Sequence, residues 1–147
     1  MKKVIGKVLK LFISREEEPK RQTRRELYLE ERGVVDDKFY NRDIERSVLL
    51  SSLDSYSLAL ESGISLEYGV LGENILIDYN PYLLLAGTQL QIGDKVVIEI
   101  VKNCTICKHL ALVDKRLPRL LRDDRGVFIK VVKEGEIKEG DTLYLLN

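Results

Sequence analysis

The sequence lacks the features of several large classes of protein. It has no excess of either charge, because 24 Lys and Arg residues balance 24 Asp and Glu residues among 147. This balance gives no general electrostatic case for binding nucleic acid or an anionic membrane, and no stripe of aromatic residues suited to stacking bases is evident. The longest uninterrupted apolar run, 82–86, is far shorter than the roughly 20 residues of a membrane span. We therefore expect neither a nucleic-acid partner nor a membrane.

Several catalytic signatures are also missing. The sequence shows no Ser-His-acid set, no phosphate-loop lysine motif and no dinucleotide-binding glycine pattern, so ordinary hydrolase or nucleotide-driven chemistry has no support. It has no repeat, low-complexity tract or linker, and its length suits one domain, residues 1–147. Lys7 and Lys10 interrupt the apolar pattern at the start of the chain, which favours a strand over a signal peptide. We expect a cytoplasmic protein with reduced cysteines.

Apolar and polar residues alternate in many short segments separated by glycine turns. This pattern predicts strands at 4–13, 26–31, 46–50, 75–77, 96–101, 126–132 and 142–146.

Helices are few in the same pattern. Ser51 or Ser52 is a suitable N-cap for a helix over 53–61. Leu53, Tyr56 and Leu60 would lie on one face of that helix. Short helical pieces are expected over 110–121, a solvated loop over 14–25, and turns around 135–141. The expected fold class is mainly β, a closed sheet or barrel with a few short helices.

Both cysteines and the single histidine lie within six residues, directly after the strongest predicted strand. Cys104, Cys107 and His109 follow the strand over 96–101. A thiolate is a soft nucleophile and a soft metal ligand. The Cys-x-x-Cys spacing suits a redox disulfide or half of a zinc site, but zinc would need two more ligands. The alternative is that each cysteine is a small buried apolar residue.

Four pieces of sequence occur in an order that resembles one known family. They are 46–50, the Gly72-Glu73-Asn74 triplet within 69–74, the segment 87–94 with the strand and cysteine that follow, and 125–128 with Gly140-Asp141. This order resembles the MOSC domain, the module named for the C-terminal domain of molybdenum-cofactor sulfurases, over residues 6–146. The resemblance implies a mixed, mostly β barrel.

The resemblance also implies two linked roles. One is to carry sulfur as a cysteine persulfide delivered by a pyridoxal-phosphate-dependent cysteine desulfurase, so that pyridoxal phosphate enters only through the partner. The other is to bind the molybdenum cofactor, with its molybdopterin, through a cysteine that ligates molybdenum. Relatives of the second kind reduce N-hydroxylated compounds with electrons from a reductase partner.

Carried over by position, Cys107 is the family cysteine, the reactive thiolate or molybdenum ligand, and Cys104 is an additional thiol that could resolve a persulfide on Cys107. Ile106 stands where the family often has proline, and Asp36-Asp37 where it often has glycine-aspartate. The residues expected to bind the cofactor are Arg46, Gly72, Glu73, Asn74, Lys108 and Arg125.

Each of these residues also has a structural interpretation. Asn74 can hold its own turn by local hydrogen bonds, His109 can be structural, and Lys38, Arg42 and the other cations can be surface charges. The leading hypothesis is a molybdenum-cofactor-binding or sulfur-carrier domain that acts through the Cys107 thiolate. The alternatives are a molybdenum-cofactor-dependent reductase with a separate electron donor, and a non-catalytic β-barrel interaction module. The sequence does not indicate an oligomeric state.

Overall fold

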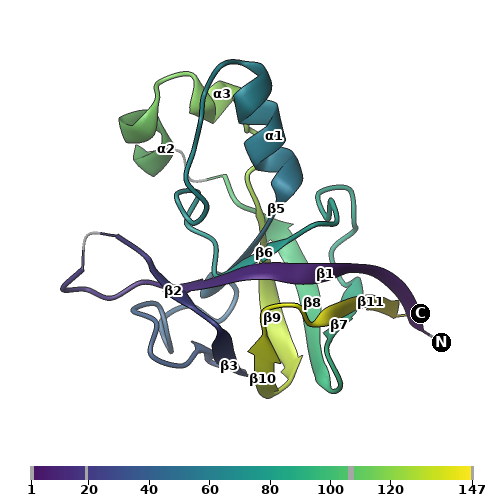
Figure 1. The fold of residues 1–147 in the computed structure, drawn as a ribbon. Helices are drawn as coiled ribbons and strands as arrows, with labels where there is room; N and C mark the ends of the chain where they lie inside the picture. Colours follow the sequence, from purple (N-terminus) through teal and green to yellow (C-terminus); the bar gives the residue numbers. More distant parts are fainter. Residues whose placement is uncertain (1, 19, 106–107, 147) are drawn as a thin grey trace.

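Seven strands close into a barrel in the computed structural model, which describes residues 2–18, 20–105 and 108–146. The strands of the protein are β1 (Lys2–Ile13), β2 (Gln22–Arg24), β3 (Glu26–Glu30), β4 (Gly33–Val34), β5 (Val48–Ser52), β6 (Ile75–Ile77), β7 (Gln89–Ile92), β8 (Val96–Asn103), β9 (Val127–Lys133), β10 (Gly135–Lys138) and β11 (Thr142–Leu146). Hydrogen bonding follows the order β11-β7-β8-β9-β5-β6-β1, and β1 pairs with β11 to close the ring. The predicted mainly β barrel is confirmed (Figure 1).

The long strand β1 makes the closure possible. Its first half pairs with β11, and its second half pairs with β6 on one edge and β2 on the other. The register shifts between Val4 and Gly6 and again between Val8 and Lys10, and such irregularities let a strand bend around a barrel. The sheet is mixed, because β5 and β6 run parallel while the other pairs of the ring are antiparallel.

Helix α1 (Leu53–Glu61) supplies the crossover that a parallel pair requires, since it links β5 to β6. Ser52 caps it by accepting a hydrogen bond from the Asp54 N–H. Of the three residues predicted to share a face, Leu53, Tyr56 and Leu60, Tyr56 is buried whereas Leu60 is 63% exposed. The face packed on the barrel consists of Ser55, Tyr56 and Ala59.

Two shorter helices, α2 (Lys108–Val113) and α3 (Leu117–Leu120), lie with α1 at one end of the barrel (Figure 1). They match the helical pieces expected over 110–121. No helix among the described residues has the length and apolar character to cross a membrane.

A second, three-stranded sheet in the order β10-β3-β4 lies beside the barrel. Residues 135–141 were expected to form only turns, but Gly135–Lys138 pair with β3 in the register Ile137 opposite Leu27. Burial of Gly135 and Ile137 between exposed Glu136 and Lys138 is the alternation of a strand, and it spans too few residues to stand out beside two glycines.

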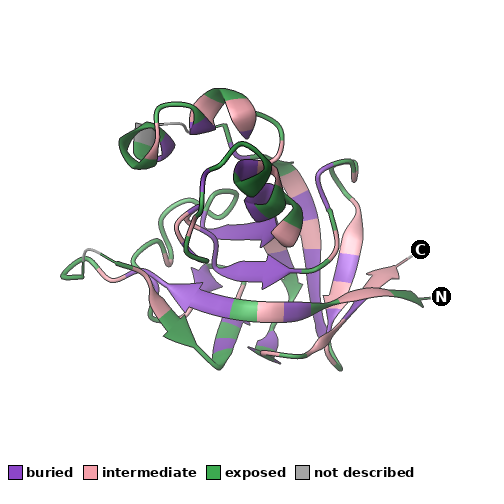
Figure 2. Ribbon diagram, turned by 45° about the horizontal axis from the view of Figure 1, so that its top comes forward, coloured by how far each residue is buried: buried purple, intermediate pink, exposed green. Residues whose placement is uncertain are grey.

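The buried apolar residues form one core inside the barrel and a second one under the helices. Figure 2 shows the buried parts concentrated on the barrel strands and on the inner face of α1. A third and much smaller group, described below, belongs to neither core.

Candidate functional site

A cavity of about 720 Å³ opens near the helical end of the barrel. Three connecting segments form its walls: wall A (residues 14–18, 20 and 21), wall B (residues 35–47) and wall C (residues 67–72). Its cationic lining residues are Lys20, Arg21, Lys38, Arg42, Arg46 and Arg125, whereas the acidic lining residues are Asp43 and Glu67. The neutral chain therefore concentrates positive charge at one place, and such a concave site attracts anions.

The floor of the cavity is apolar and contains a thiol. Leu49, Cys104 and Phe128 form a buried cluster that is separate from the two larger cores, and all three line the cavity. Cys104 is 4% exposed, and its N–H donates to the Gly126 carbonyl over 2.9 Å. The thiol thus lies at the base of a cavity whose mouth is cationic.

The guanidinium groups at the mouth are held only loosely. Arg42 of wall B pairs with Glu16 of wall A, and Arg46 lies 3.9 Å from Asp43. All four side chains are more than half exposed, and exposed ion pairs are worth little. Each arginine can exchange its carboxylate for another anion at small cost.

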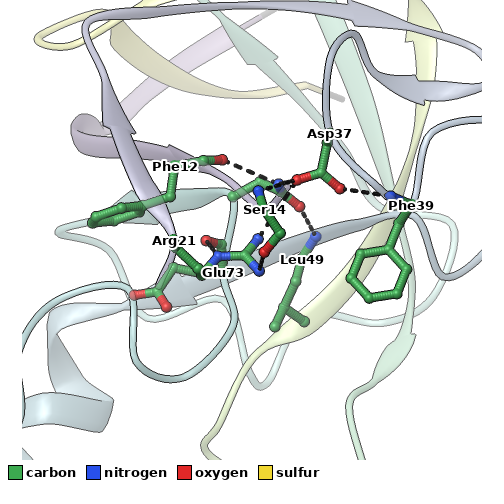
Figure 3. Close-up of polar contacts among 8 residues, drawn as sticks. Phe12, Ser14, Arg21, Asp37, Phe39, Leu49 and Glu73 are labelled. Carbon is green, nitrogen blue, oxygen red and sulfur yellow. Dashed lines mark hydrogen bonds and ion pairs between the residues drawn. The ribbon is translucent and has the colours of Figure 1, made fainter. Parts of the chain in front are cut away.

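Arg21 fixes wall A by bonds that the sequence did not reveal (Figure 3). Its Nε donates to the Glu73 carbonyl over 3.0 Å, and its Nη1 donates to the Ser14 hydroxyl. Asp37 lies 4.0 Å from its Nη2. Burial lowers the pKa of Arg21, and the negative charge of Asp37 opposes that shift. The prediction of a solvated loop over 14–25 is therefore wrong at Arg21, and it also missed β2.

Asn74 joins three segments through one side chain. Its Oδ1 accepts from the Leu49 N–H over 3.2 Å, and its Nδ2 donates to the Phe12 carbonyl over 3.1 Å and to Asp37 Oδ1 over 3.2 Å. Asp37 in turn accepts from the backbone N–H groups of Ser14 and Phe39 (Figure 3). These bonds engage both amide hydrogens of Asn74. They are structural, but they reach residues far away in the sequence rather than the local turn partners that the alternative interpretation expected.

Glu73 lies behind wall C, fully buried, and does not line the cavity. Its Oε2 accepts from the Tyr56 hydroxyl and from the Gly69 N–H, the latter over 3.3 Å. Its Oε1 has no hydrogen-bond partner among the described residues. Burial raises the pKa of the Glu73 carboxyl, while the Tyr56 bond and the Arg21 charge act in the opposite direction.

Gly72 and Arg125 meet at the cavity. The Arg125 Nε donates to the Leu71 carbonyl over 3.0 Å, and its side chain is buried, with the residue 7% exposed. A Cβ on Gly72 would lie 3.4 Å from the Arg125 Nη2, and Gly72 has a φ of 92°. Glycine at this position therefore allows the turn and the close approach of the guanidinium.

Asp36 stands where the family often has glycine, and its backbone conformation explains why either residue fits there. Asp36 has a φ of 75°, in the left-handed region that glycine adopts without strain. Aspartate tolerates this left-handed conformation better than most other residues that are not glycine, so Asp36 can adopt it. The loop geometry that presents the Asp37 carboxylate is thereby retained.

The structure gathers most of the residues that the sequence singled out. Arg46, Gly72, Asn74, Cys104 and Arg125 all line the cavity, as do Lys38, Arg42 and His109. Glu73 stands behind the wall. Cys107 lies outside the described residues, and for Lys108 only the backbone, at the start of α2, is described.

Sequence reasoning passed over Arg21, Asp37 as a bonded carboxylate, and the aromatic residues Phe39 and Tyr68. Phe39 and Tyr68 lie close to the motifs at 36–37 and 69–74 in the sequence, and this position is the one signal that could have drawn attention to them.

Comparisons with known proteins agree with the barrel. The family model described as MOSC domain matches residues 31–144. The structure is similar to that of the YuaD protein from Bacillus subtilis, with a TM-score of 0.86 at 14% identity over 99% of this chain and 97% of that one. It also resembles YiiM from Geobacillus stearothermophilus (TM-score 0.69, 14% identity, 100% of this chain and 76% of that one).

YiiM from Escherichia coli is similar too, with a TM-score of 0.67 at 16% identity over 95% of this chain and 69% of that one. No curated protein matches the chain significantly.

Proposed function

The chain belongs to the MOSC domain family, and from this premise we propose that its cavity binds the molybdenum cofactor and that a thiol at the cavity acts on the bound group or on sulfur destined for it. One observation carries the proposal: cationic side chains at the mouth lead to a thiol on an apolar floor within one space of about 720 Å³. That volume is in the range of small-molecule cofactor sites, roughly 300–1,000 Å³.

The residues present fit an anionic, ring-containing cofactor. Arg42 and Arg46, which hold only exposed carboxylates, would bind its phosphate, because a guanidinium matches phosphate with two parallel hydrogen bonds. The apolar floor of Leu49 and Phe128 suits a flat pterin ring better than a sugar or a free ion. When bound, the cofactor supplies a metal centre for two-electron reduction or for accepting sulfur.

The thiols supply the nucleophile. In the carrier hypothesis, the Cys107 thiolate attacks the terminal sulfur of a desulfurase's cysteine persulfide, a new S–S bond forms on Cys107, and the donor cysteine leaves as a thiolate. Cys104 would then release that sulfur by attacking the Cys107 sulfur, which forms a Cys104–Cys107 disulfide and expels hydrosulfide. A separate dithiol reductant would restore both thiols.

The decisive experiment is elemental analysis for molybdenum on protein purified from a host that makes the cofactor. The wild type is compared with Cys107→Ser and with Arg42→Ala/Arg46→Ala. We expect near-stoichiometric molybdenum in the wild type and a loss in both variants. No molybdenum in the wild type would contradict cofactor binding, and mass spectrometry for a persulfide on Cys107 would then decide whether a carrier role survives.

The same experiment separates the alternatives. Metal that disappears in Cys107→Ser, together with turnover of an N-hydroxylated compound by the wild type and a chemical reductant, favours the reductase. A wild type that carries neither molybdenum nor persulfide sulfur, and that is unchanged by Cys107→Ser, fits the non-catalytic interaction module.

A further inference from the structure

We propose that Glu73 is a positioning residue that acts as a neutral carboxylic acid, fixing wall C so that Tyr68 faces the ligand and α2 stays next to the cavity. The proposal rests on the cavity being the ligand site, as proposed above. It adds a role for a buried acid that does not itself touch the cavity.

Wall C is anchored to Glu73 through Tyr56. The Gly69 N–H donates to the Tyr56 hydroxyl over 2.9 Å and to Glu73 Oε2 over 3.3 Å, and Tyr56 donates to the same Glu73 oxygen. This three-membered network holds the middle of wall C against α1. A buried network whose members are bonded to one another has a single low-energy arrangement.

Tyr68 is the side chain that this anchor places. Its ring packs edge-to-face on Tyr56, with centroids 4.9 Å apart and an interplanar angle of 80°. It lines the cavity and is 49% exposed. A half-exposed aromatic ring held by a second ring is suited to stack on a flat ligand, so Tyr68 would select for a ring in the ligand.

Wall C is also tied to α2, one residue after Gly69. The Val70 carbonyl lies 2.9 Å from His109 Nε2, and His109 also lines the cavity. Wall C therefore connects Glu73, which bonds to Gly69, with α2, which bonds to Val70 through His109.

Glu73 connects the other walls through its backbone. Its carbonyl accepts from Arg21 of wall A, and the next residue, Asn74, bonds to Asp37 of wall B. The groups that face the carboxyl are Tyr56 from α1 and Arg21 from wall A, and Tyr82 interacts with it electrostatically. Arg125 adds charge near Arg21.

A neutral acid fits this surrounding better than a carboxylate. Glu73 is fully buried, and Oε1 has no hydrogen-bond partner among the described residues. The Arg21 guanidinium is engaged with the Glu73 carbonyl, the Ser14 hydroxyl and Asp37, so it compensates a negative charge on the carboxyl only in part. Burial raises the pKa of the group, which is consistent with protonation. An amide of the same shape should therefore replace the acid.

The test compares Glu73→Gln, Glu73→Ala and Tyr56→Phe by hydrogen exchange of residues 67–72 in the protein without ligand, with β8 as the internal reference. We expect Glu73→Gln to keep wall C within about twofold of the wild type. Glu73→Ala and Tyr56→Phe should speed exchange there at least about tenfold while β8 is unchanged. Glu139→Gln is the control, because Glu139 Oε2 also lacks a hydrogen-bond partner within the described part of the chain, although it lies 3.9 Å from Lys10 Nζ, and Glu139 directly follows β10.

Two further readouts separate positioning from simple stability. The wild type should lose stability relative to Glu73→Gln as pH rises above about 4.5, the ordinary value for glutamate, because the unfolded chain releases the proton that the folded chain retains. Binding of neopterin monophosphate, followed by pterin fluorescence, should weaken at least about fivefold in Glu73→Ala and Tyr68→Ala and stay within about twofold in Glu73→Gln.

The outcomes distinguish the two proposals. A wild type that does not bind the pterin phosphate contradicts the proposed function, while exchange and pH dependence still decide the role of Glu73. Exchange in wall C that is unchanged in both Glu73→Ala and Tyr56→Phe overturns the positioning role. A Glu73→Gln protein that behaves like Glu73→Ala overturns the neutral acid. If Glu73→Ala does not fold, Tyr56→Phe carries the same comparison.

Discussion

Replacing Asn74 with alanine should destabilise the barrel more than any single change at the cavity surface. The side chain is 2% exposed and makes three hydrogen bonds, to the Leu49 N–H, the Phe12 carbonyl and Asp37 Oδ1. Losing each of these buried bonds costs about 1–2 kcal/mol, and the lower value applies to Asp37 Oδ1, which still accepts from the Ser14 N–H. The expected loss in the free energy of unfolding is therefore about 3–5 kcal/mol, equivalent to roughly 10–15 °C in Tm for a chain of this size.

Urea unfolding followed by circular dichroism measures this loss, with Asn103→Ala as the matched control, because Asn103 is exposed at the end of β8. The control should change stability by less than about 0.5 kcal/mol. Asn74→Asp keeps the volume and the acceptor for Leu49 but sets a second carboxylate against Asp37, so it should not rescue stability at neutral pH. A loss below about 1 kcal/mol in Asn74→Ala would refute the assignment of Asn74 as a junction between segments.

Three other changes test particular features of the structure. Asp36→Gly should raise the unfolding free energy by about 0.5–1 kcal/mol, because glycine adopts the φ of 75° without strain, and a decrease would contradict that explanation. Gly69→Ala should lower the unfolding free energy by about 2 kcal/mol more than Gly140→Ala. Both glycines have positive φ, but a Cβ on Gly69 would meet Phe12 at 2.9 Å, whereas a Cβ on Gly140 would meet nothing within 4 Å. Equal losses in chemical unfolding would exclude the steric argument. Arg42→Ala should change stability by less than about 0.5 kcal/mol, since its ion pair is exposed, yet weaken binding of neopterin monophosphate in a fluorescence titration; unchanged affinity would remove Arg42 from the anion site.

The barrel was predictable because its information is local. Alternation of apolar and polar residues marks β1, β8 and β9 within single stretches of sequence, and the cap at Ser52 sets the start of α1. The strand β10 escaped because four residues between glycines hold too little of the pattern. Its pairing with β3, more than 100 residues earlier, is what makes it a strand.

The site was predictable only where a motif carried it. The order of motifs drew attention to Arg46, Gly72, Asn74 and Arg125, and these residues do meet at one cavity. Arg21 could not have been found in the same way. It is one of many charged residues in SREEEPKRQTRR. It is buried only because the fold places this segment against the Glu73 carbonyl and Asp37, which are distant in the sequence.

The Gly-Glu-Asn triplet supports the walls of the cavity from behind its lining. Gly72 gives Arg125 room, the Glu73 side chain supports wall C, and Asn74 bonds to wall B. None of these bonds uses the exposed cations at the mouth. The YuaD structure superimposes with a TM-score of 0.86 at only 14% identity, so this architecture tolerates extensive substitution.

Because the Gly72-Glu73-Asn74 triplet fixes the backbone of the walls, the side chains that project from walls A and B can change without altering the fold of these segments. We therefore expect differences in ligand selectivity between such barrels to follow the residues at the mouth, Lys38, Arg42 and Arg46, and stability to follow the triplet. A variant that exchanges only the mouth residues should change affinity for a pterin phosphate while its urea midpoint stays the same, whereas a variant of the triplet should change both.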